Sequence, residues 1–138
     1  TGGYPFFLQV WGAHCWEEAP ALPITLANAK QASRNALAAL DESIFKVRLA
    51  RLTERQKAYA RAMAEFGPAL ASSTDVARSM GLAAAQAAPI RDELIKKGMA
   101  YSPERGLIGF TVPMFDEFMR RAMAPLAPPK AAKKAARP

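Results

Sequence analysis

Few residues of the kinds that build metal and nucleophile sites occur in this chain. Its 138 residues include one histidine and one cysteine, and the two are neighbours, His14 and Cys15. A single cysteine excludes an intramolecular disulfide framework and favours a reducing compartment. Because side chains at i and i+1 of a helix do not face each other, we expect this pair to fill buried or edge positions. We expect no catalytic site and no metal site in the chain.

Long apolar runs are also missing. The longest, Tyr4–Trp16, has 13 residues and is interrupted by Gln9, Gly12 and His14, whereas a membrane-spanning helix needs about 20. No basic stretch precedes it, as one would in a signal peptide. We therefore expect a cytoplasmic protein without membrane contact. Because the chain begins at Thr1 and not at Met, we also expect it to be part of a longer protein.

The net charge of +7 is concentrated near the C-terminus. Residues 1–52 carry five basic and four acidic side chains, residues 53–124 carry ten and eight, and residues 125–138 carry four basic side chains and no acidic one. A segment rich in Ala, Pro and Lys has nothing to bury and is typical of disorder. We predict a disordered basic tail over 124–138, which either solubilises the protein or binds phosphates without sequence preference.

The stretch from Ser73 to Val112 predicts a helix-turn-helix followed by a β-hairpin. Two helices flank a tight turn at Gly81-Leu82, and two short strands are joined across Pro103–Gly106. The predicted helices are Ser73–Met80 and Ala84–Lys97, and the predicted strands are Met99–Ser102 and Leu107–Thr111. This order of elements is that of a winged helix, which binds DNA or a protein partner.

Helices fill most of the remaining chain. One starts at Pro5, which suits a first helical turn, and runs to about Glu18. A second has Thr25 as its N-cap and an apolar face made of Leu26, Ala29, Ser33, Leu37 and Leu40. A third spans Glu42–Leu52, and the three predict a small bundle. A fourth starts with a capping box at Thr53–Gln56 and turns Tyr59, Met63 and Phe66 inward. A last helix follows Pro113 and buries Phe115, Phe118, Met119 and Ala122.

The opening segment Thr1–Gln9 resembles the start of the helical lid in P-loop ATPases of the AAA+ and STAND superfamily. Leu52-Thr53-Glu54-Arg55-Gln56, the helix exit Lys97-Gly98-Met99 and Phe110-Thr111-Val112-Pro113 are similar to the winged helices of archaeal and bacterial members. The resemblance covers about residues 1–123. It implies that a nucleotide-binding core precedes this region, as in archaeal origin-recognition ATPases, and that the lid and winged helix follow the core.

The resemblance also implies a nucleotide contact at Gly3, Tyr4 and Pro5, which match the Gly-x-Pro motif of such lids. In relatives the proline packs on the adenine. A rigid ring beside a helix N-terminus is chemically suited to this, because it offers a flat apolar contact next to a positive dipole end. No Gly-x-x-x-x-Gly-Lys-Ser/Thr loop is present, so we expect ATP and magnesium only in a full-length ATPase. This chain is expected to hold no cofactor and to be no enzyme.

The second helix of the helix-turn-helix presents few groups that read bases. If Ala87, Ile90, Leu94 and Ile95 are buried, the opposite face consists of Ala85, Ala88, Pro89, Asp92 and Lys96. Direct readout uses Arg, Lys, Asn or Gln, and near the helix start only Gln86 qualifies. The sequence does not exclude contacts to phosphates. The candidate residues for DNA or a protein partner are Ser73, Thr74, Gln86, Arg91, Lys96, Lys97 and Arg105.

These patterns predict a mainly α protein in three parts. A helical bundle occupies 1–52, which the resemblance identifies as the lid-like C-terminal part of an ATPase core. A winged helix-turn-helix domain with a two-stranded β-wing occupies 53–123, and the basic tail follows. We expect a lid that senses nucleotide and a winged helix that binds DNA, without sequence preference, or a protein partner. A stand-alone winged-helix regulator that dimerises through its first helices, and a pure protein-interaction module, are the alternatives.

Overall fold

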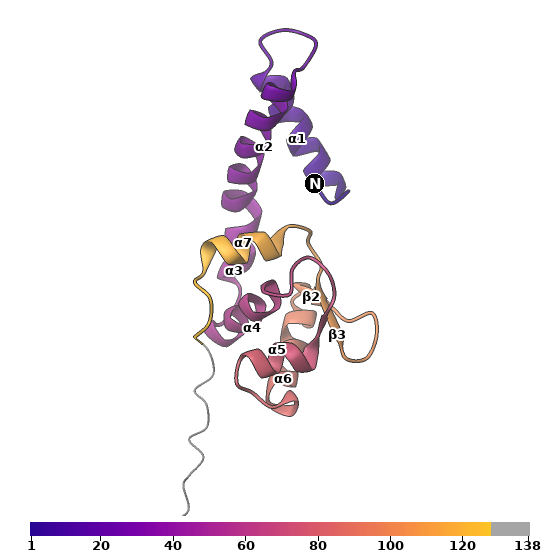
Figure 1. Cartoon of the computed structure of the whole chain (residues 1–138), viewed down its shortest axis with the longest axis vertical. Coiled ribbons are helices and arrows are strands. Elements are labelled where there is room, and N and C mark those ends of the chain that lie inside the picture. Colours follow the sequence, from indigo (N-terminus) through magenta and orange to yellow (C-terminus); the bar gives the residue numbers. More distant parts are fainter. Residues whose placement is uncertain (128–138) are drawn as a thin grey trace, which may run out of the picture.

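The computed structural model describes residues 1–127 and is mainly helical, with a small antiparallel sheet (Figure 1). The helices are α1 (Pro5–Glu18), α2 (Leu26–Leu40), the π-helical turn η1 (Asp41–Phe45), α3 (Lys46–Ala50), α4 (Glu54–Ala64), α5 (Ser73–Ser79), α6 (Ala84–Lys96) and α7 (Phe115–Ala122). The strands are β1 (Ala71–Ser72), β2 (Ala100–Tyr101) and β3 (Leu107–Phe110). The prediction of a mainly helical fold is confirmed. The predicted tail residues 128–138 lie outside the described part.

Helices α1 and α2 form a hairpin arm that projects from the rest of the molecule (Figure 1). Thr25 is the N-cap of α2, as predicted, and it exchanges capping hydrogen bonds with Asn28. The Trp11 indole donates to Ser33 Oγ at 3.1 Å, and the Asn28 amide donates to the Glu18 carbonyl at 3.2 Å. These polar contacts hold α1 against α2 over most of the length of the arm.

Helix α2 continues through η1 into α3 without a break, so the prediction that Glu42–Leu52 forms a helix of its own is wrong. No glycine or proline interrupts residues 26–50, and nothing else ends the helix at Leu40. Within η1 the Lys46 N–H donates to the Asp41 carbonyl, the five-residue spacing of a π-turn. The buried positions of this long helix are Ala32, Ala36, Leu40 and Phe45. The last step spans five residues, so the π-turn keeps Phe45 on the buried side.

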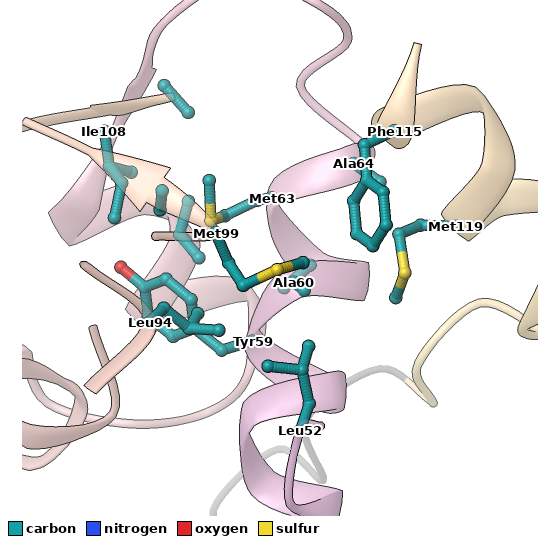
Figure 2. Close-up of a cluster of buried hydrophobic side chains, with 14 of the residues drawn as sticks. Leu52, Tyr59, Ala60, Met63, Ala64, Leu94, Met99, Ile108, Phe115 and Met119 are labelled. Atoms are coloured by element: carbon teal, nitrogen blue, oxygen red, sulfur yellow. The ribbon is translucent and has the colours of Figure 1, made fainter. Parts of the chain in front are cut away.

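Helix α4 lies at the centre of the core (Figure 2). It begins with the predicted capping box, in which Thr53 and Gln56 bond reciprocally. Tyr59 and Met63 point toward Leu94, Met99 and Ile108, whereas Ala60 and Ala64 lie on the side of Phe115 and Met119. Because partners surround α4, its buried residues run without interruption from Tyr59 to Ala64.

The sheet has three strands in the order β1-β3-β2, one more than the sequence predicts. Ala71 pairs with Ile108, and Ala100 pairs with Phe110. The sequence did not predict β1, because two residues are too few to show an alternating pattern. A strand of this length still supplies the hydrogen bonds that close one edge of β3.

Three predicted core residues are exposed: Phe66, Leu26 and Ala122, which is the last residue of α7. Phe66 is 40% exposed because α4 ends two residues earlier, at Ala64. Leu26 is 71% exposed because it opens α2 at the outer end of the arm. Leu126, in the segment predicted to have nothing to bury, is half-buried and packs against the core. Among residues 1–127, no helix combines the length and the apolar character needed to cross a membrane.

Candidate nucleic-acid interface

The buried face of α6 is the one that the sequence predicts, whereas Ala88, predicted on the exposed face, is half-buried. Ala87, Ile90 and Leu94 are buried, and Ile95 packs against the core from its edge. The exposed positions are Ala84, Ala85, Gln86, Pro89, Asp92, Glu93 and Lys96. The outer face of α6 thus carries methyl groups, one proline ring and a few charges, with little that could read base edges.

Gln86, the single base-reading candidate, has a structural task. Its side-chain oxygen accepts the N–H of Ala83 at 2.9 Å. Ala83 cannot cap α6 with its own side chain, so this bond from the third helical position satisfies a backbone donor that would otherwise lack a partner at the start of the helix. A direct contact of Gln86 with a base would have to compete with that role.

The two lysines at the end of α6, Lys96 and Lys97, also contact other groups of the protein. Lys97 Nζ donates to the Arg51 carbonyl at 2.8 Å and to Gln56 Oε1 at 2.6 Å. It therefore ties the C-terminus of α6 to the α3–α4 connection. Lys96 forms an exposed ion pair with Glu93 at 3.2 Å, which contributes little to stability. Of the two, Lys96 is the one whose charge is free to contact a ligand.

Ser73 joins the start of α5 to the loop between β2 and β3. Its backbone N–H donates to the Gly106 carbonyl at 2.8 Å, and its hydroxyl donates to the same oxygen at 3.2 Å. Arg105, next to Gly106, is exposed, and within the described part of the chain it has no ion pair. Thr74 is exposed beside Ser73. The structure therefore brings Ser73, Thr74 and Arg105 together.

Tyr59, on α4, reaches the same region from the core side. It lines a cavity of about 30 Å³ together with Ser73, Ala84, Ala87, Ala88 and Arg91. The Tyr59 side chain is fully buried, and its hydroxyl has no hydrogen-bond partner among the described protein groups. Burial raises the pKa of Tyr59 to about 12, Arg91 acts in the opposite direction, and Asp92 adds to the rise. The hydroxyl therefore keeps its proton at neutral pH and can donate it.

Arg91 borders this cavity from α6. Its Nε and Nη2 donate to Asp92 Oδ1 at 3.2 and 3.0 Å, and its side chain is 31% exposed. An ion pair with that much exposure is screened by solvent and easily exchanged for another. Arg91 is thus the candidate cation closest to a buried donor, and it joins Ser73 at one site.

The predicted nucleotide-contact residues lie far along the chain from this site. Tyr4 packs edge-on against Phe7, with ring centroids 5.0 Å apart, and Pro5 is exposed in the first turn of α1. A cavity of about 410 Å³ lies near them, and its lining includes Thr1, Gly2, Asp116 and Glu117 but none of Gly3, Tyr4 and Pro5. Two carboxyl groups and no basic side chain in the lining are ill suited to phosphates.

His14 and Cys15 form no site with other ligand side chains. His14 Nδ1 lies 3.5 Å from Glu17 Oε2, and Cys15 is a half-buried free thiol. Across the described residues, no cluster of three or more His, Cys, Asp and Glu side chains is placed to hold a metal ion.

Two residues of the candidate interface were not identified from the sequence as functional: Tyr59, which lines the cavity, and Asp92, which pairs with Arg91 beside it. The sequence predicts Tyr59 as a core residue, and helical spacing carries no information about whether a buried hydroxyl finds a partner. Asp92 was placed on the exposed face, but its pairing with the adjacent Arg91 depends on side-chain rotamers. No sequence signal distinguishes this ion pair from an ordinary surface charge.

A family model for a domain of unknown function matches residues 42–119, which is more than half of the chain. The chain belongs to the DUF8462 family. The DUF8462 match begins within η1 and ends within α7, so it contains the core around α4, the sheet and the Tyr59 cavity but not α1 or α2. No curated protein and no solved structure matches the chain.

Proposed function

We propose that the DUF8462 region is a winged-helix module that binds duplex DNA through the phosphate backbone. Helices α4, α5 and α6 pack on one another, the three-stranded sheet lies beside them, and the β2–β3 loop stands out from the body as a wing (Figure 1). This arrangement supports the winged-helix reading, in which α6 enters the groove and the wing follows the backbone.

The observation that carries the proposal is the link between Ser73 and Gly106. It holds the wing, with the exposed Arg105, against the start of α5. Ser73 in turn lines the same cavity as Arg91 of α6. Cations from the wing and from α6 thus flank one set of hydroxyl groups, which is a pattern suited to phosphate oxygens. The bare outer face of α6 favours binding without sequence preference.

The direct test is the affinity of the full chain for short duplexes of unrelated sequence, measured by fluorescence anisotropy at low salt. The proposal expects similar dissociation constants for all sequences and a strong decrease of affinity with salt. A variant with Lys130, Lys133, Lys134 and Arg137 changed to Gln separates the predicted tail contribution from that of residues 1–127. Binding that disappears in this variant would assign the DNA contact to the tail and reject the winged helix as the reader.

The nucleotide-sensing lid stays a prediction. It requires an ATPase core upstream, with ATP and magnesium bound there, and a contact of the adenine with Pro5. The exposed position of Pro5 at the start of α1 leaves its ring accessible for such a contact. Replacing Pro5 by Ala in the full-length protein should weaken nucleotide binding, and an unchanged dissociation constant would reject the lid.

A second candidate function is self-association through the hairpin arm. Helix α1 carries apolar side chains on all sides: Phe7 is buried, whereas Phe6, Leu8 and Trp16 are 47%, 54% and 68% exposed. Exposed apolar surface of this kind often marks a protein contact. Light scattering of the wild type and of Leu8→Glu tests it. A monomer at all concentrations would reject the idea, and a dimer that Leu8→Glu dissociates would support it.

A further inference from the structure

A fully buried hydroxyl without a protein partner is the least explained polar group of the core. Buried polar atoms almost always have hydrogen-bond partners, so each exception calls for a reason. The Tyr59 hydroxyl is such an exception. It lies on the side of α4 that faces α6 and the strands, away from Phe115 (Figure 2), and the Tyr59 side chain lines a cavity that helps to form the candidate interface.

The size of the cavity limits what can enter it beside Tyr59. About 30 Å³ is room for a single oxygen-sized atom and not for a base or a sugar. Half of its six lining residues are alanines of α6, namely Ala84, Ala87 and Ala88. The run of alanines that makes α6 poor at reading bases therefore also lines the cavity beside Tyr59.

The electrostatics of the cavity favour an anion. Arg91 lines it, and no acidic side chain does. The first turn of α6 lies at its edge through Ala84, and Ala83 gives that turn no side-chain cap. Uncapped N–H groups at a helix N-terminus favour negative charge. A protonated hydroxyl, a guanidinium group and a helix N-terminus together form a set of donors for one oxyanion.

We propose that the Tyr59 cavity receives one non-bridging oxygen of a backbone phosphate. The Tyr59 hydroxyl donates to that oxygen, and Arg91 exchanges its ion pair with Asp92 for one with the phosphate. The inference rests on the proposed DNA binding and deepens it, because it names the contact at which the backbone is anchored. It also gives a role to the unpartnered hydroxyl, which completes its hydrogen bonding only when the duplex is bound.

The first test compares Tyr59→Phe with Tyr101→Phe in the full chain, by duplex affinity at low salt. Tyr101 is 45% exposed on β2 and does not line the cavity. We expect Tyr59→Phe to weaken binding of every sequence roughly tenfold, as for the loss of one hydrogen bond to a charged group, and Tyr101→Phe to bind as the wild type does. Thermal melts verify that both variants fold.

Two other results would overturn the inference in different ways. If Tyr59→Phe binds like the wild type while Arg105→Gln binds more weakly, the cavity takes no phosphate oxygen but the proposed DNA binding stands. If the wild type itself does not bind duplexes at low salt, the proposed function fails and the inference fails with it.

The second test uses the ion pair of Arg91. Asp92→Asn frees Arg91, whereas Glu93→Gln removes the same charge from the pair with Lys96 one residue away. We expect Asp92→Asn to strengthen duplex binding severalfold more than Glu93→Gln does. Equal effects would mean that only the net charge matters and would contradict the exchange of partners by Arg91.

A free phosphate ion shares the chemistry of the backbone phosphate, so a third arm distinguishes the two sources. Inorganic phosphate is titrated against the wild type and Tyr59→Phe, with chloride keeping the ionic strength constant. The proposal expects phosphate to compete with the duplex weakly. Saturable phosphate binding that Tyr59→Phe abolishes, without any change in duplex affinity, would assign the cavity to a free anion and overturn the proposal.

Discussion

The ring of Phe45 stands edge-on to the ring of Phe7, with centroids 5.9 Å apart and an interplanar angle of 87°. On its other sides Phe45 contacts Phe115 and Phe118, at 5.7 and 5.2 Å between centroids. All four side chains are buried. Phe45 sits in the π-turn, so this single side chain connects the hairpin arm to α7 and to the core of the DUF8462 region.

Replacing Phe45 by Ala should therefore lower the free energy of unfolding by about 3–5 kcal/mol, the usual cost of deleting a buried aromatic ring. Val47→Ala is the matched control, because Val47 lies two residues further along the same helix and is 49% exposed. Its effect should stay within about 0.5 kcal/mol. Urea unfolding followed by circular dichroism measures both. Similar losses in the two variants would contradict the connecting role of Phe45.

Tyr59→Phe should raise the free energy of unfolding by about 1 kcal/mol, because it removes a buried hydroxyl that no protein group satisfies. The same substitution at the exposed Tyr101 should change stability little. The signature is thus a variant that is more stable and yet binds DNA more weakly, which a purely structural role of Tyr59 does not produce. A clear loss of stability in Tyr59→Phe would show that the hydroxyl has a partner in the free protein.

The raised pKa of Tyr59 predicts a loss of stability at alkaline pH. The unfolded state releases this proton near pH 10.0, whereas the folded state keeps it until about pH 12. Between these values the unfolded state binds fewer protons, so stability falls with rising pH, by about 1.4 kcal/mol per pH unit for this group. The stability difference between Tyr59→Phe and the wild type should widen above pH 10 and stay constant below it. A constant difference through pH 11 would refute the shift.

Gly2 and Gly3 offer a paired test of how the N-terminal segment is held. Both have positive φ, +58° and +72°. A Cβ on Gly2 would lie 2.7 Å from Pro113 Cβ, whereas a Cβ on Gly3 would meet nothing within 4 Å. We expect Gly3→Ala to show only the backbone cost of about 1 kcal/mol, and Gly2→Ala to displace the segment from Pro113. Hydrogen exchange of the amides in the first turn of α1 measures this displacement, as lower protection in Gly2→Ala. Equal protection in the two variants would contradict the contact between Gly2 and Pro113.

The sequence predicted the helices well where capping and turn residues mark their ends. The Thr25 and Thr53 caps, the start of α1 at Pro5 and the end of α5 before Gly81 are all where we expected them. The prediction from sequence was wrong between α2 and α3, where the spacing of buried residues changes from four to five. A pattern search with a fixed helical period interprets that change as a new helix, whereas the chain accommodates it with a π-turn.

The site was less predictable than the fold, for a physical reason. Sequence reasoning found the exposed cations and the bare face of α6. It could not show that Lys97 donates hydrogen bonds to Gln56 and the Arg51 carbonyl, or that Gln86 accepts the N–H of Ala83 at the start of α6. These contacts depend on side-chain conformations, which the sequence pattern does not give. The cavity at Tyr59 likewise exists only where three helices meet, and the sequence of no single helix predicts it.

The central claim, that α6 and the wing bind the phosphate backbone, is tested most directly by the salt dependence of duplex affinity. The measurement compares the wild type with Arg91→Gln and Arg105→Gln, and with Arg34→Gln as a charge-matched control on the exposed side of the arm. Each phosphate contact that is lost should reduce the slope of log K against log salt by about 0.9. The account predicts that reduction for Arg91→Gln and Arg105→Gln and an unchanged slope for Arg34→Gln. Equal slopes for all four proteins, or no binding at low salt, would contradict it.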